Sequence, residues 1–215
     1  MKAMILAAGL GTRMKKIGEE TPKALLLINN RPLIVYHLEN LAKAGYKEVV
    51  INVCAHADKI KKTLKEGREF GVHIHYSTET KPLGTGGGIV KALPLLGNQH
   101  FLVISADIWT DYPLNQLPAY LPNPAHLVLV DNPPDHKQGD FGLEDGIVIA
   151  SSDKKLTYGG IGLFHPKLFN QPRSNIFSII DILNPAIAKR QVTGEHYQGK
   201  WININTPEIL KQIES

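Results

Sequence analysis

The stretch Leu6-Ala-Ala-Gly-Leu-Gly-Thr-Arg-Met14 follows a short apolar run at the start of the chain. A glycine-rich loop directly after a strand lies where an open parallel sheet places its ligand crevice. Gly9 and Gly11 let backbone amides approach an anion closely, and the small side chains of Ala7 and Ala8 leave room for a flat base. The stretch therefore predicts a buried strand followed by a loop that binds the phosphates of a nucleotide.

Two cations accompany this loop. Arg13 lies within it, and Thr21-Pro-Lys23 brings Lys23 back beside it. A planar guanidinium holds phosphate oxygens through two parallel hydrogen bonds. A dinucleotide site would need a third glycine where Met14 stands and an acidic residue near Asn52, and the triphosphatase loop would need Gly-Lys-Ser/Thr. Since these features are missing, the pattern favours a different class of nucleotide-binding protein.

Apolar runs alternate with helical periodicity through the first half of the chain. We expect strands at 3–7, 48–53, 72–76 and 101–105, and helices at 32–44, 58–66 and 86–93. In the second half we expect strands at 127–130, 146–150 and 156–164, and helices at 176–190, interrupted at Pro185, and 207–213. Strands separated by helices pair in parallel with right-handed crossovers. The prediction is one α/β domain over residues 1–215, a doubly wound, mostly parallel Rossmann-like sheet with a strand-rich C-terminal half.

Composition excludes several classes of protein. The 215 residues are 43% apolar and 20% charged, as expected of a globular protein with a sizeable core. No apolar run approaches the roughly 20 residues that span a bilayer, and no signal peptide opens the chain, so we expect a cytoplasmic protein without a membrane partner. Residues 1–100 hold 15 Lys and Arg against 8 acidic residues, without basic runs interleaved with aromatics, which suits a phosphorylated small molecule better than nucleic acid.

Cysteine and histidine do not predict a metal site. The chain has a single cysteine, Cys54, so an internal disulfide and a cysteine-rich zinc cluster are both excluded. His73 and His75 share one face of an expected strand, but a zinc site needs a third ligand that the sequence does not suggest. Polar surface histidines are therefore the expected interpretation.

Further motifs extend the first one along nearly the whole chain. They are Pro82-Leu-Gly-Thr-Gly-Gly-Gly88, Asp107-Ile-Trp-Thr-Asp-Tyr112, Gly139-Asp-Phe-Gly142, Tyr158-Gly-Gly-Ile-Gly-Leu-Phe-His-Pro166 and Val192-Thr-Gly-Glu-His-Tyr-Gln-Gly-Lys-Trp201. Together with the glycine-rich loop and Thr21-Pro-Lys23, they resemble the sugar-1-phosphate nucleotidyltransferase family. Within it, they most resemble the N-acetylmuramic acid 1-phosphate uridylyltransferases of bacterial cell-wall recycling.

The resemblance implies that a sugar-phosphate oxygen attacks the α-phosphorus of UTP and that pyrophosphate leaves. It implies that Arg13 stabilises the β and γ phosphates and that Lys23 bridges the α-phosphate and the sugar phosphate. Reactions of this kind depend on alignment and charge neutralisation. Asp107 follows an apolar strand at the sheet edge where ligands bind, and such a carboxylate is suited to anchoring Mg²⁺.

The C-terminal motif departs from the family pattern Trp-x-Asp-x-Gly-Thr-Pro, which supplies a second carboxylate to the metal. This chain reads Trp201-Ile-Asn-Ile-Asn-Thr-Pro207, with Asn203 at the metal position and Asn205 in place of glycine. An amide oxygen can coordinate a hard cation but brings no charge, so we expect weaker Mg²⁺ binding by Asp107 and Asn203.

The resemblance also implies residues that contact the substrates. For the nucleotide these are Ala7, Ala8, Gly9, Gly11, Thr12, Thr85, Gly86 and Gly87, and for the sugar they are Asp140, Gly142, Glu144 and Gly160. Gly87 stands where pyrimidine-specific relatives often carry a glutamine, so we expect backbone groups and Thr85 to read the base.

Two other functions remain open. Guanylyltransferases for mannose-type or heptose 1-phosphates carry similar Leu-Gly-Thr loops. A nucleotide-binding regulatory homologue, catalytically weakened by Asn203, belongs to another functional class. The chain ends soon after Thr206-Pro-Glu208, without the C-terminal segments that longer relatives use for assembly, so we expect a monomer.

Overall fold

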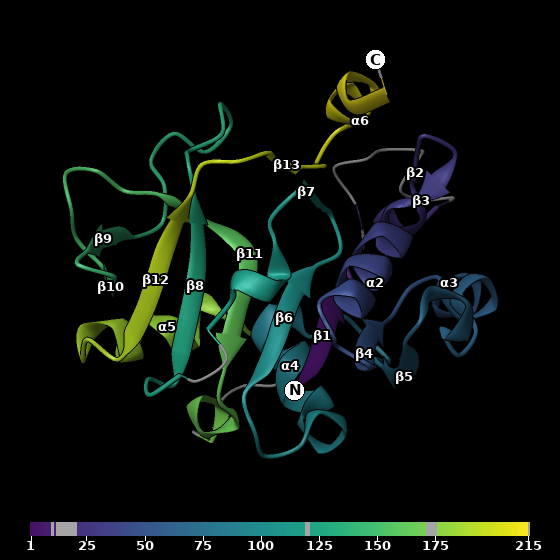
Figure 1. Ribbon diagram of the computed structural model, residues 1–215, viewed down its shortest axis with the longest axis horizontal. Helices are drawn as coiled ribbons and strands as arrows, with labels where there is room; N and C mark the ends of the chain where they lie inside the picture. The colour runs from purple at the N-terminus through teal and green to yellow at the C-terminus, as the bar shows by residue number, and fades with distance from the viewer. Residues whose placement is uncertain (10, 12–20, 119–120, 171–175, 215) are drawn as a thin grey trace.

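The computed structural model describes residues 1–9, 11, 21–118, 121–170 and 176–214. Its main feature is a nine-stranded mixed sheet with the strand order β5-β4-β1-β6-β11-β8-β12-β10-β9 (Figure 1). The strands of this sheet are β1 (Lys2–Leu6), β4 (Glu48–Val53), β5 (His73–Thr78), β6 (Phe101–Ser105), β8 (Ala125–Val130), β9 (Gly142–Glu144), β10 (Ile147–Ile149), β11 (Thr157–Phe164) and β12 (Val192–Tyr197). The α-helices of the described residues are α2 (Leu33–Lys43), α3 (Ala57–Leu64), α4 (Gly84–Leu96), α5 (Ile180–Ala188) and α6 (Pro207–Glu214).

The first half of the sheet is parallel, as the sequence predicts. β1 pairs in parallel with β4 and β6, and β4 pairs in parallel with β5. The near-continuous apolar runs of β1, β4 and β6 are typical of strands covered by helices on both faces, whereas β5, at the sheet edge, is more polar. The carboxyl ends of these four strands consequently meet at one edge of the sheet, which is where the predicted loop begins.

The second half is strand-rich, as expected, and largely antiparallel. β11 lies between β6 and β8 and runs antiparallel to both, while β9 and β10 form a hairpin at the edge. The expected elements omit β12, which pairs in parallel with β8. Its sequence, VTGEHY, has only Val192 as a large aliphatic residue, and Gly194 weakens the strand pattern, so pairing with β8 decides its conformation.

Two helix predictions are wrong at their boundaries. α5 begins at Ile180 instead of residue 176, and Pro185 lies inside it without interrupting it. α4 begins at Gly84 and extends to Leu96, longer than the predicted 86–93, and it contains Pro94. Tertiary packing overrides the local preference of proline in both helices.

The core has two layers, one on each face of the sheet. One apolar cluster joins Ile34 and Leu38 of α2 and Ile60 of α3 to strand residues such as Ile5 and Ile51. The other joins Ile89 of α4 and Leu183 of α5 to residues on the opposite strand faces, among them Met4, Val50 and Val103. Helices on both faces make the fold doubly wound, in agreement with the prediction.

The C-terminal segment returns to the first half of the chain (Figure 1). β13 (Trp201–Asn203) pairs with β7 (Ile108–Thr110), which directly follows β6, and brings Asn203 opposite Ile108. α6 then contacts β2 (Leu27–Ile28), which forms a small hairpin with β3 (Arg31–Pro32). Among the helices of the described residues, none is long and apolar enough to cross a membrane.

Candidate functional site

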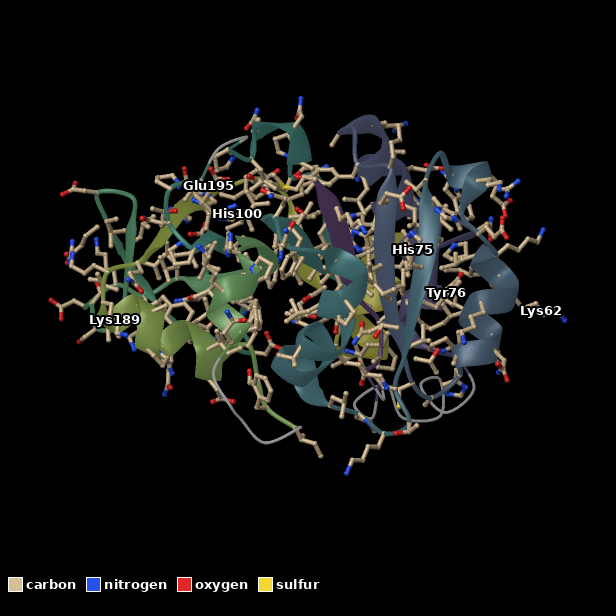
Figure 2. The ribbon with its side chains drawn as sticks, turned by 90° about the horizontal axis from the view of Figure 1, so that it is seen from below. Lys62, His75, Tyr76, His100, Lys189 and Glu195 are labelled. Atoms are coloured by element: carbon tan, nitrogen blue, oxygen red, sulfur yellow. The ribbon has the colours of Figure 1, made fainter. Side chains whose placement is uncertain are left out.

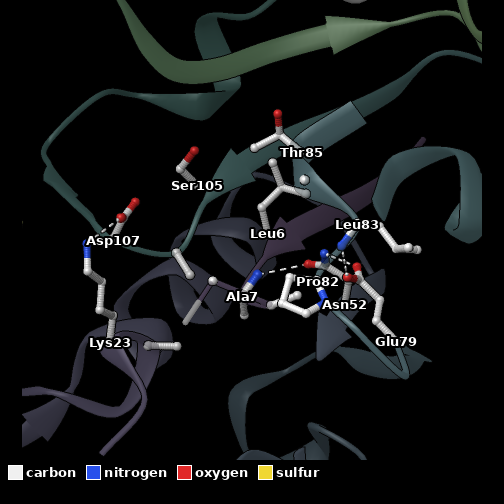
Figure 3. Close-up of a pocket in the computed structure, with 15 residues that line it drawn as sticks. Leu6, Ala7, Lys23, Asn52, Glu79, Pro82, Leu83, Thr85, Ser105 and Asp107 are labelled. Carbon is white, nitrogen blue, oxygen red and sulfur yellow. Dashed lines mark hydrogen bonds and ion pairs between the residues drawn. The ribbon is translucent and has the colours of Figure 1, made fainter. Parts of the chain in front are cut away.

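A pocket lies at the carboxyl edge of the parallel strands (Figure 3). The ends of β1, β4 and β6 and the segments that follow β1, β5 and β6 contribute to it, together with the start of α4 and the 3₁₀ helix η2 (Lys23–Leu25). Its lining residues are Leu6, Ala7, Ala8, Gly9, Lys23, Ala24, Asn52, Glu79, Pro82, Leu83, Gly84, Thr85, Ser105, Ala106 and Asp107. The sheet topology therefore gathers residues from Leu6 to Asp107, which are 101 positions apart in the sequence.

Lys23 and Asp107 meet at one side of the pocket. Lys23 Nζ donates a hydrogen bond to Asp107 Oδ2 at 3.0 Å and another to Asn205 Oδ1 at 3.2 Å (Figure 3 shows the first). The Lys23 side chain is only 12% exposed, so its charge acts where water screens it weakly. An ammonium group has three donors, which leaves a third donor of Lys23 for another ligand.

Asn203 and Asn205 reach this corner through the pairing of β13 with β7. The Ile204 amide donates to the Asp107 carbonyl at 2.8 Å, which fixes the segment against the end of β6. Asn205 is buried and accepts from Lys23. Asn203 Oδ1 is buried and, among the residues that the structure describes, has no hydrogen-bond partner. A buried amide oxygen without a partner can serve as a ligand for a hard cation, and although Asn203 is not among the residues that line the pocket, its segment is bonded to the Asp107 backbone.

A buried polar network forms the other side of the pocket. The Ala7 amide donates to Asn52 Oδ1 at 2.8 Å, and Asn52 Nδ2 donates to Glu79 Oε1 at 2.7 Å. Glu79 Oε2 accepts from the Leu83 amide at 3.1 Å. This chain of hydrogen bonds connects the glycine-rich loop to the entry of α4 and fixes the distance between them.

Sequence reasoning does not assign roles to Asn52, Glu79, Ser105 or Asn205. The sequence could have indicated the first three by their position, because Asn52 and Ser105 lie at the ends of β4 and β6 and Glu79 directly follows β5. Polar residues at the carboxyl ends of parallel strands are candidate ligand contacts. Asn205 has no such signal, since the pairing of β13 with β7 determines its place.

The glycine-rich loop is described in part. Ala7, Ala8 and Gly9 line the pocket, and their contact with a nucleotide stays a prediction; Gly11 has a φ of 63°, which glycine adopts without strain. Thr12 and Arg13 lie outside the described residues, so their predicted contacts with the nucleotide stay predictions.

Several polar groups at the start of α4 form hydrogen bonds with the segment before α5 instead of facing the pocket. Thr85 lines the pocket, but its Oγ1 accepts a hydrogen bond from the Ile179 amide at 2.8 Å. The amides of Gly86 and Gly87 donate to the Phe177 carbonyl, and neither glycine lines the pocket. A Cβ at residue 86 would lie 2.4 Å from the Phe177 ring, so close packing of this segment requires that glycine.

Among the predicted sugar-binding residues, Gly160 packs against Ser105 of the pocket lining. It has a φ of 72°, and a Cβ there would lie 2.7 Å from the Oγ of Ser105. This positive φ coincides with the change of β11–β8 register between Tyr158 and Ile161. Gly160 thus lets β11 approach the wall of the pocket.

The other three predicted sugar-binding residues are not part of the pocket lining. A Cβ at Gly142 would lie 2.4 Å from Ser152 Cβ, so packing accounts for that glycine. Asp140 accepts from the Tyr158 amide at 2.8 Å and pairs with His136 at 3.0 Å. Glu144 is exposed at the end of β9.

His37 of α2 lies beneath the Asp107 loop. Burial lowers its pKa to about 4, although the Ile108 backbone, the Asp107 charge and the Ala106 backbone act in the opposite direction. The imidazole of His37 is therefore neutral at neutral pH, so Lys23 is the cation that faces Asp107 and His37 adds no positive charge beneath this pair.

The doubly wound sheet carries a glycine-rich loop, Lys23 and Asp107 at the carboxyl ends of its parallel strands. This arrangement is typical of α/β proteins that bind nucleotides and catalyse phosphoryl-type transfer. A family model described as nucleotidyl transferase matches residues 2–152. The chain therefore belongs to the nucleotidyl transferase family, and the sequence prediction is confirmed at that level.

Individual proteins that are similar to this chain are also nucleotidyltransferases. The chain is 38% identical, over all of its length and 97% of the relative, to an N-acetylmuramate alpha-1-phosphate uridylyltransferase of Neisseria meningitidis. It is 34% identical to a mannose-1-phosphate guanyltransferase of Aspergillus fumigatus, with 88% of this chain but only 51% of that relative covered. A Bacillus anthracis structure, provisionally described as a glucose-1-phosphate thymidylyltransferase in complex with a sucrose, has a TM-score of 0.88 at 23% identity and covers 100% of this chain and 94% of its own. This last likeness concerns the fold.

Proposed function

We propose that this enzyme transfers a uridylyl group from UTP to a hexosamine 1-phosphate, N-acetylmuramic acid 1-phosphate, giving a UDP-sugar and pyrophosphate for cell-wall recycling. The observation that carries the proposal is the approach of Lys23 Nζ to Asp107 Oδ2, at 3.0 Å, beside an alanine- and glycine-lined pocket. The nearly full-length similarity to the Neisseria uridylyltransferase supports the choice of base and sugar.

In the proposed step, a phosphate oxygen of the sugar phosphate forms a bond to the α-phosphorus of UTP. The bond between that phosphorus and the oxygen bridging to the β-phosphate breaks, and pyrophosphate leaves with that oxygen. Lys23 would donate its third N–H to a phosphate oxygen while Asp107 and Asn205 hold the other two. Arg13 would bind the leaving pyrophosphate. Such positioning of charge accounts for much of the catalysis in this class of reaction.

Mg²⁺ is the proposed cofactor, held by Asp107 and Asn203. The buried Oδ1 of Asn203, which has no hydrogen-bond partner within the described part of the chain, supports this assignment, because an oxygen donor set suits a hard cation. When bound, Mg²⁺ would neutralise charge on the triphosphate. We expect Asn203→Asp to lower the Mg²⁺ concentration needed for half-maximal activity severalfold, with unchanged or higher kcat. A large loss of kcat in this variant would contradict the assignment.

A guanylyltransferase is the second candidate, since the Aspergillus relative is a mannose-1-phosphate guanyltransferase. Pyrophosphate release should be measured with UTP, GTP, CTP, ATP and dTTP against N-acetylmuramic acid, N-acetylglucosamine, glucose and mannose 1-phosphates. We expect kcat/KM to be highest for UTP with N-acetylmuramic acid 1-phosphate. Preference for GTP would favour the guanylyltransferase, and tight UTP binding without turnover would favour the regulatory homologue.

We further propose that residues 1–215 act as one domain and as a monomer. The nine-stranded sheet supports the first point, because β1 near one end of the chain and β12 near the other belong to it. Analytical ultracentrifugation tests the second, with the mass of one chain, 23.7 kDa, as the expected result.

A further inference from the structure

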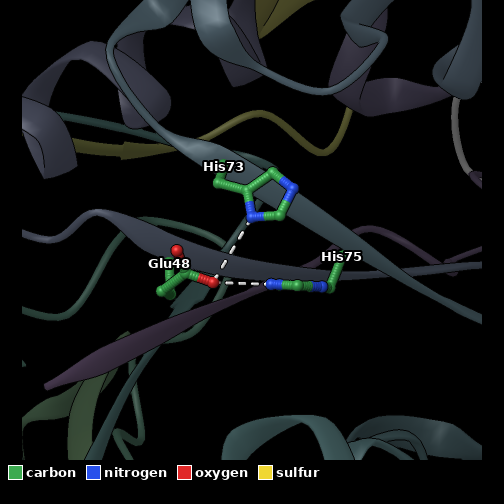
Figure 4. A group of neighbouring side chains, drawn as sticks. All are labelled: Glu48, His73 and His75. Carbon is green, nitrogen blue, oxygen red and sulfur yellow. Dashed lines mark hydrogen bonds and ion pairs between the residues drawn. The ribbon is translucent and has the colours of Figure 1, made fainter.

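Three potential metal ligands meet at the end of β4 and β5 that lies opposite the nucleotide pocket (Figure 4). Glu48 is the first residue of β4, and its register partner on β5 is His73. His75 lies two residues further along β5, so it projects from the same face of the strand as His73. The neighbouring strand thus supplies the third ligand that the sequence of β5 lacks.

The spacing of the ligand atoms is close to that of a metal site. One atom from each residue lies within 4.8 Å of the others. Glu48 Oε2 lies 3.5 Å from His73 Nδ1 and 2.6 Å from His75 Nε2. Two ligands about 2.1 Å from a tetrahedral ion are about 3.4 Å apart. The Glu48–His73 distance already matches this value, whereas the hydrogen bond between Glu48 and His75 has to lengthen, which rotation of these side chains allows.

The cluster is open to solvent and carries a charged ligand. The side chains of Glu48, His73 and His75 are 42%, 51% and 32% exposed. Glu48 contributes a carboxylate oxygen, which adds negative charge to the two imidazole ligands. A hydrated ion can enter such a site and retain water as its remaining ligand.

We propose that Glu48, His73 and His75 bind one divalent transition-metal ion, with Zn²⁺ as the expected ion and water completing its coordination. Two imidazole nitrogens and one carboxylate select Zn²⁺, Co²⁺, Ni²⁺ or Cu²⁺ over Mg²⁺. The site is separate from the proposed Mg²⁺ position at Asp107 and does not depend on the proposed function.

The bound ion would cross-link the edge of the sheet. β5 is the edge strand beside β4, and the opposite ends of these two strands lead to Asn52 and Glu79, which are hydrogen-bonded in the pocket. An ion held by both strands opposes their separation at the end that lacks this network. We therefore expect Zn²⁺ to stabilise the folded chain, since it binds the native state in preference to the unfolded one.

The test is calorimetric titration of the full chain, without a polyhistidine tag, with ZnCl₂ in excess Mg²⁺. We expect one Zn²⁺ per chain with micromolar affinity. The variants His73→Ala, His75→Ala and Glu48→Gln should each weaken binding by about tenfold or more. Co²⁺ in place of Zn²⁺ should give visible absorption bands that His75→Ala abolishes.

A second histidine pair provides the matched control. The rings of His100 and His165 are arranged edge to face with their centroids 4.7 Å apart, and those of His73 and His75 are arranged in the same way with their centroids 4.6 Å apart. His100 lies away from His75 in Figure 2, and the pair is not among the metal-competent clusters of the described residues. The double variant His100→Ala/His165→Ala should bind Zn²⁺ as the wild type does, and so should Asp107→Asn.

Thermal unfolding gives an independent measurement. Saturating Zn²⁺ should raise the Tm of the wild type by several degrees and leave that of His75→Ala unchanged. The proposal is overturned if His75→Ala binds Zn²⁺ as tightly as the wild type, or if binding is lost in Asp107→Asn or in the control pair instead. Failure of the proposed uridylyl transfer would leave each of these measurements unaffected.

Discussion

The parallel strands β5, β4, β1 and β6 and the largely antiparallel strands β11, β8, β12, β10 and β9 share one sheet but differ in how they use polar residues. In the parallel half, residues such as Lys23, Asn52, Glu79 and Asp107 converge on one pocket. In the other half, Asp140 is bound within the fold, and Glu144 is exposed at a hairpin.

The difference follows from topology. Parallel strands direct all their carboxyl ends to one edge, so the residues after them meet whatever their separation in sequence. Antiparallel strands send alternate ends to opposite edges, and their turns are dispersed. Sequence motifs in the parallel half therefore predict that their residues lie together in one site, whereas motifs in the antiparallel half predict only local structure.

The largest expected effect is that of Lys23→Ala. Loss of a preorganised cation should lower kcat/KM by at least 100-fold, corresponding to about 3 kcal/mol. Steady-state pyrophosphate release measures this effect, and Lys62→Ala, on the exposed surface of α3, is the matched control. Wild-type activity of Lys23→Ala would contradict the proposal that the pocket in the parallel half is the active site.

His37 sharpens the comparison through pH, because it lies beneath the parallel half. Its pKa is about 4 in the folded chain and about 6.5 when unfolded, so the unfolded state binds the proton first as pH falls. The resulting stability is present above pH 6.5 and is lost between about pH 6.5 and 4, by about 3 kcal/mol.

Urea unfolding at several pH values measures this loss. His37→Leu should show a smaller slope of unfolding free energy against pH over the same range, whatever its absolute stability. Equal slopes for the variant and the wild type would show that His37 is not buried as a neutral group.

Gly160→Ala and Gly142→Ala compare a glycine at the boundary of the two halves with one inside the antiparallel half. Both should destabilise by about 1–3 kcal/mol, since each Cβ would overlap a neighbour and residue 160 also has a positive φ. Only Gly160→Ala should also lower kcat/KM, by about tenfold, because it displaces Ser105 of the pocket wall. Equal loss of kcat/KM in both variants, assayed well below their Tm, would break the distinction.

Glu144→Gln should have the smallest effect. Glu144 is exposed outside the pocket lining, so the KM for the sugar phosphate should change by less than about threefold. Steady-state kinetics with varied sugar phosphate measure it. A tenfold increase of that KM would instead support the sequence-based assignment of Glu144 to the sugar.

The sequence alone predicts the α/β class, the parallel first half and the positions of Lys23 and Asp107. It does so because apolar runs, glycines and prolines act locally, and because the motifs resemble those of a family whose members share a fold. It does not predict β12, whose conformation depends on pairing with β8, or the continuation of α5 through Pro185.

Tertiary structure alone decides which polar groups meet. Asn205 reaches Lys23 because β13 pairs with β7, and Glu48 joins His73 because β4 and β5 are in register. Contacts of this kind depend on strand order and register, which no single segment encodes. The sequence therefore determined the elements and the family, while the assembly of those elements decided the partners of Lys23 and created the cluster at the sheet edge.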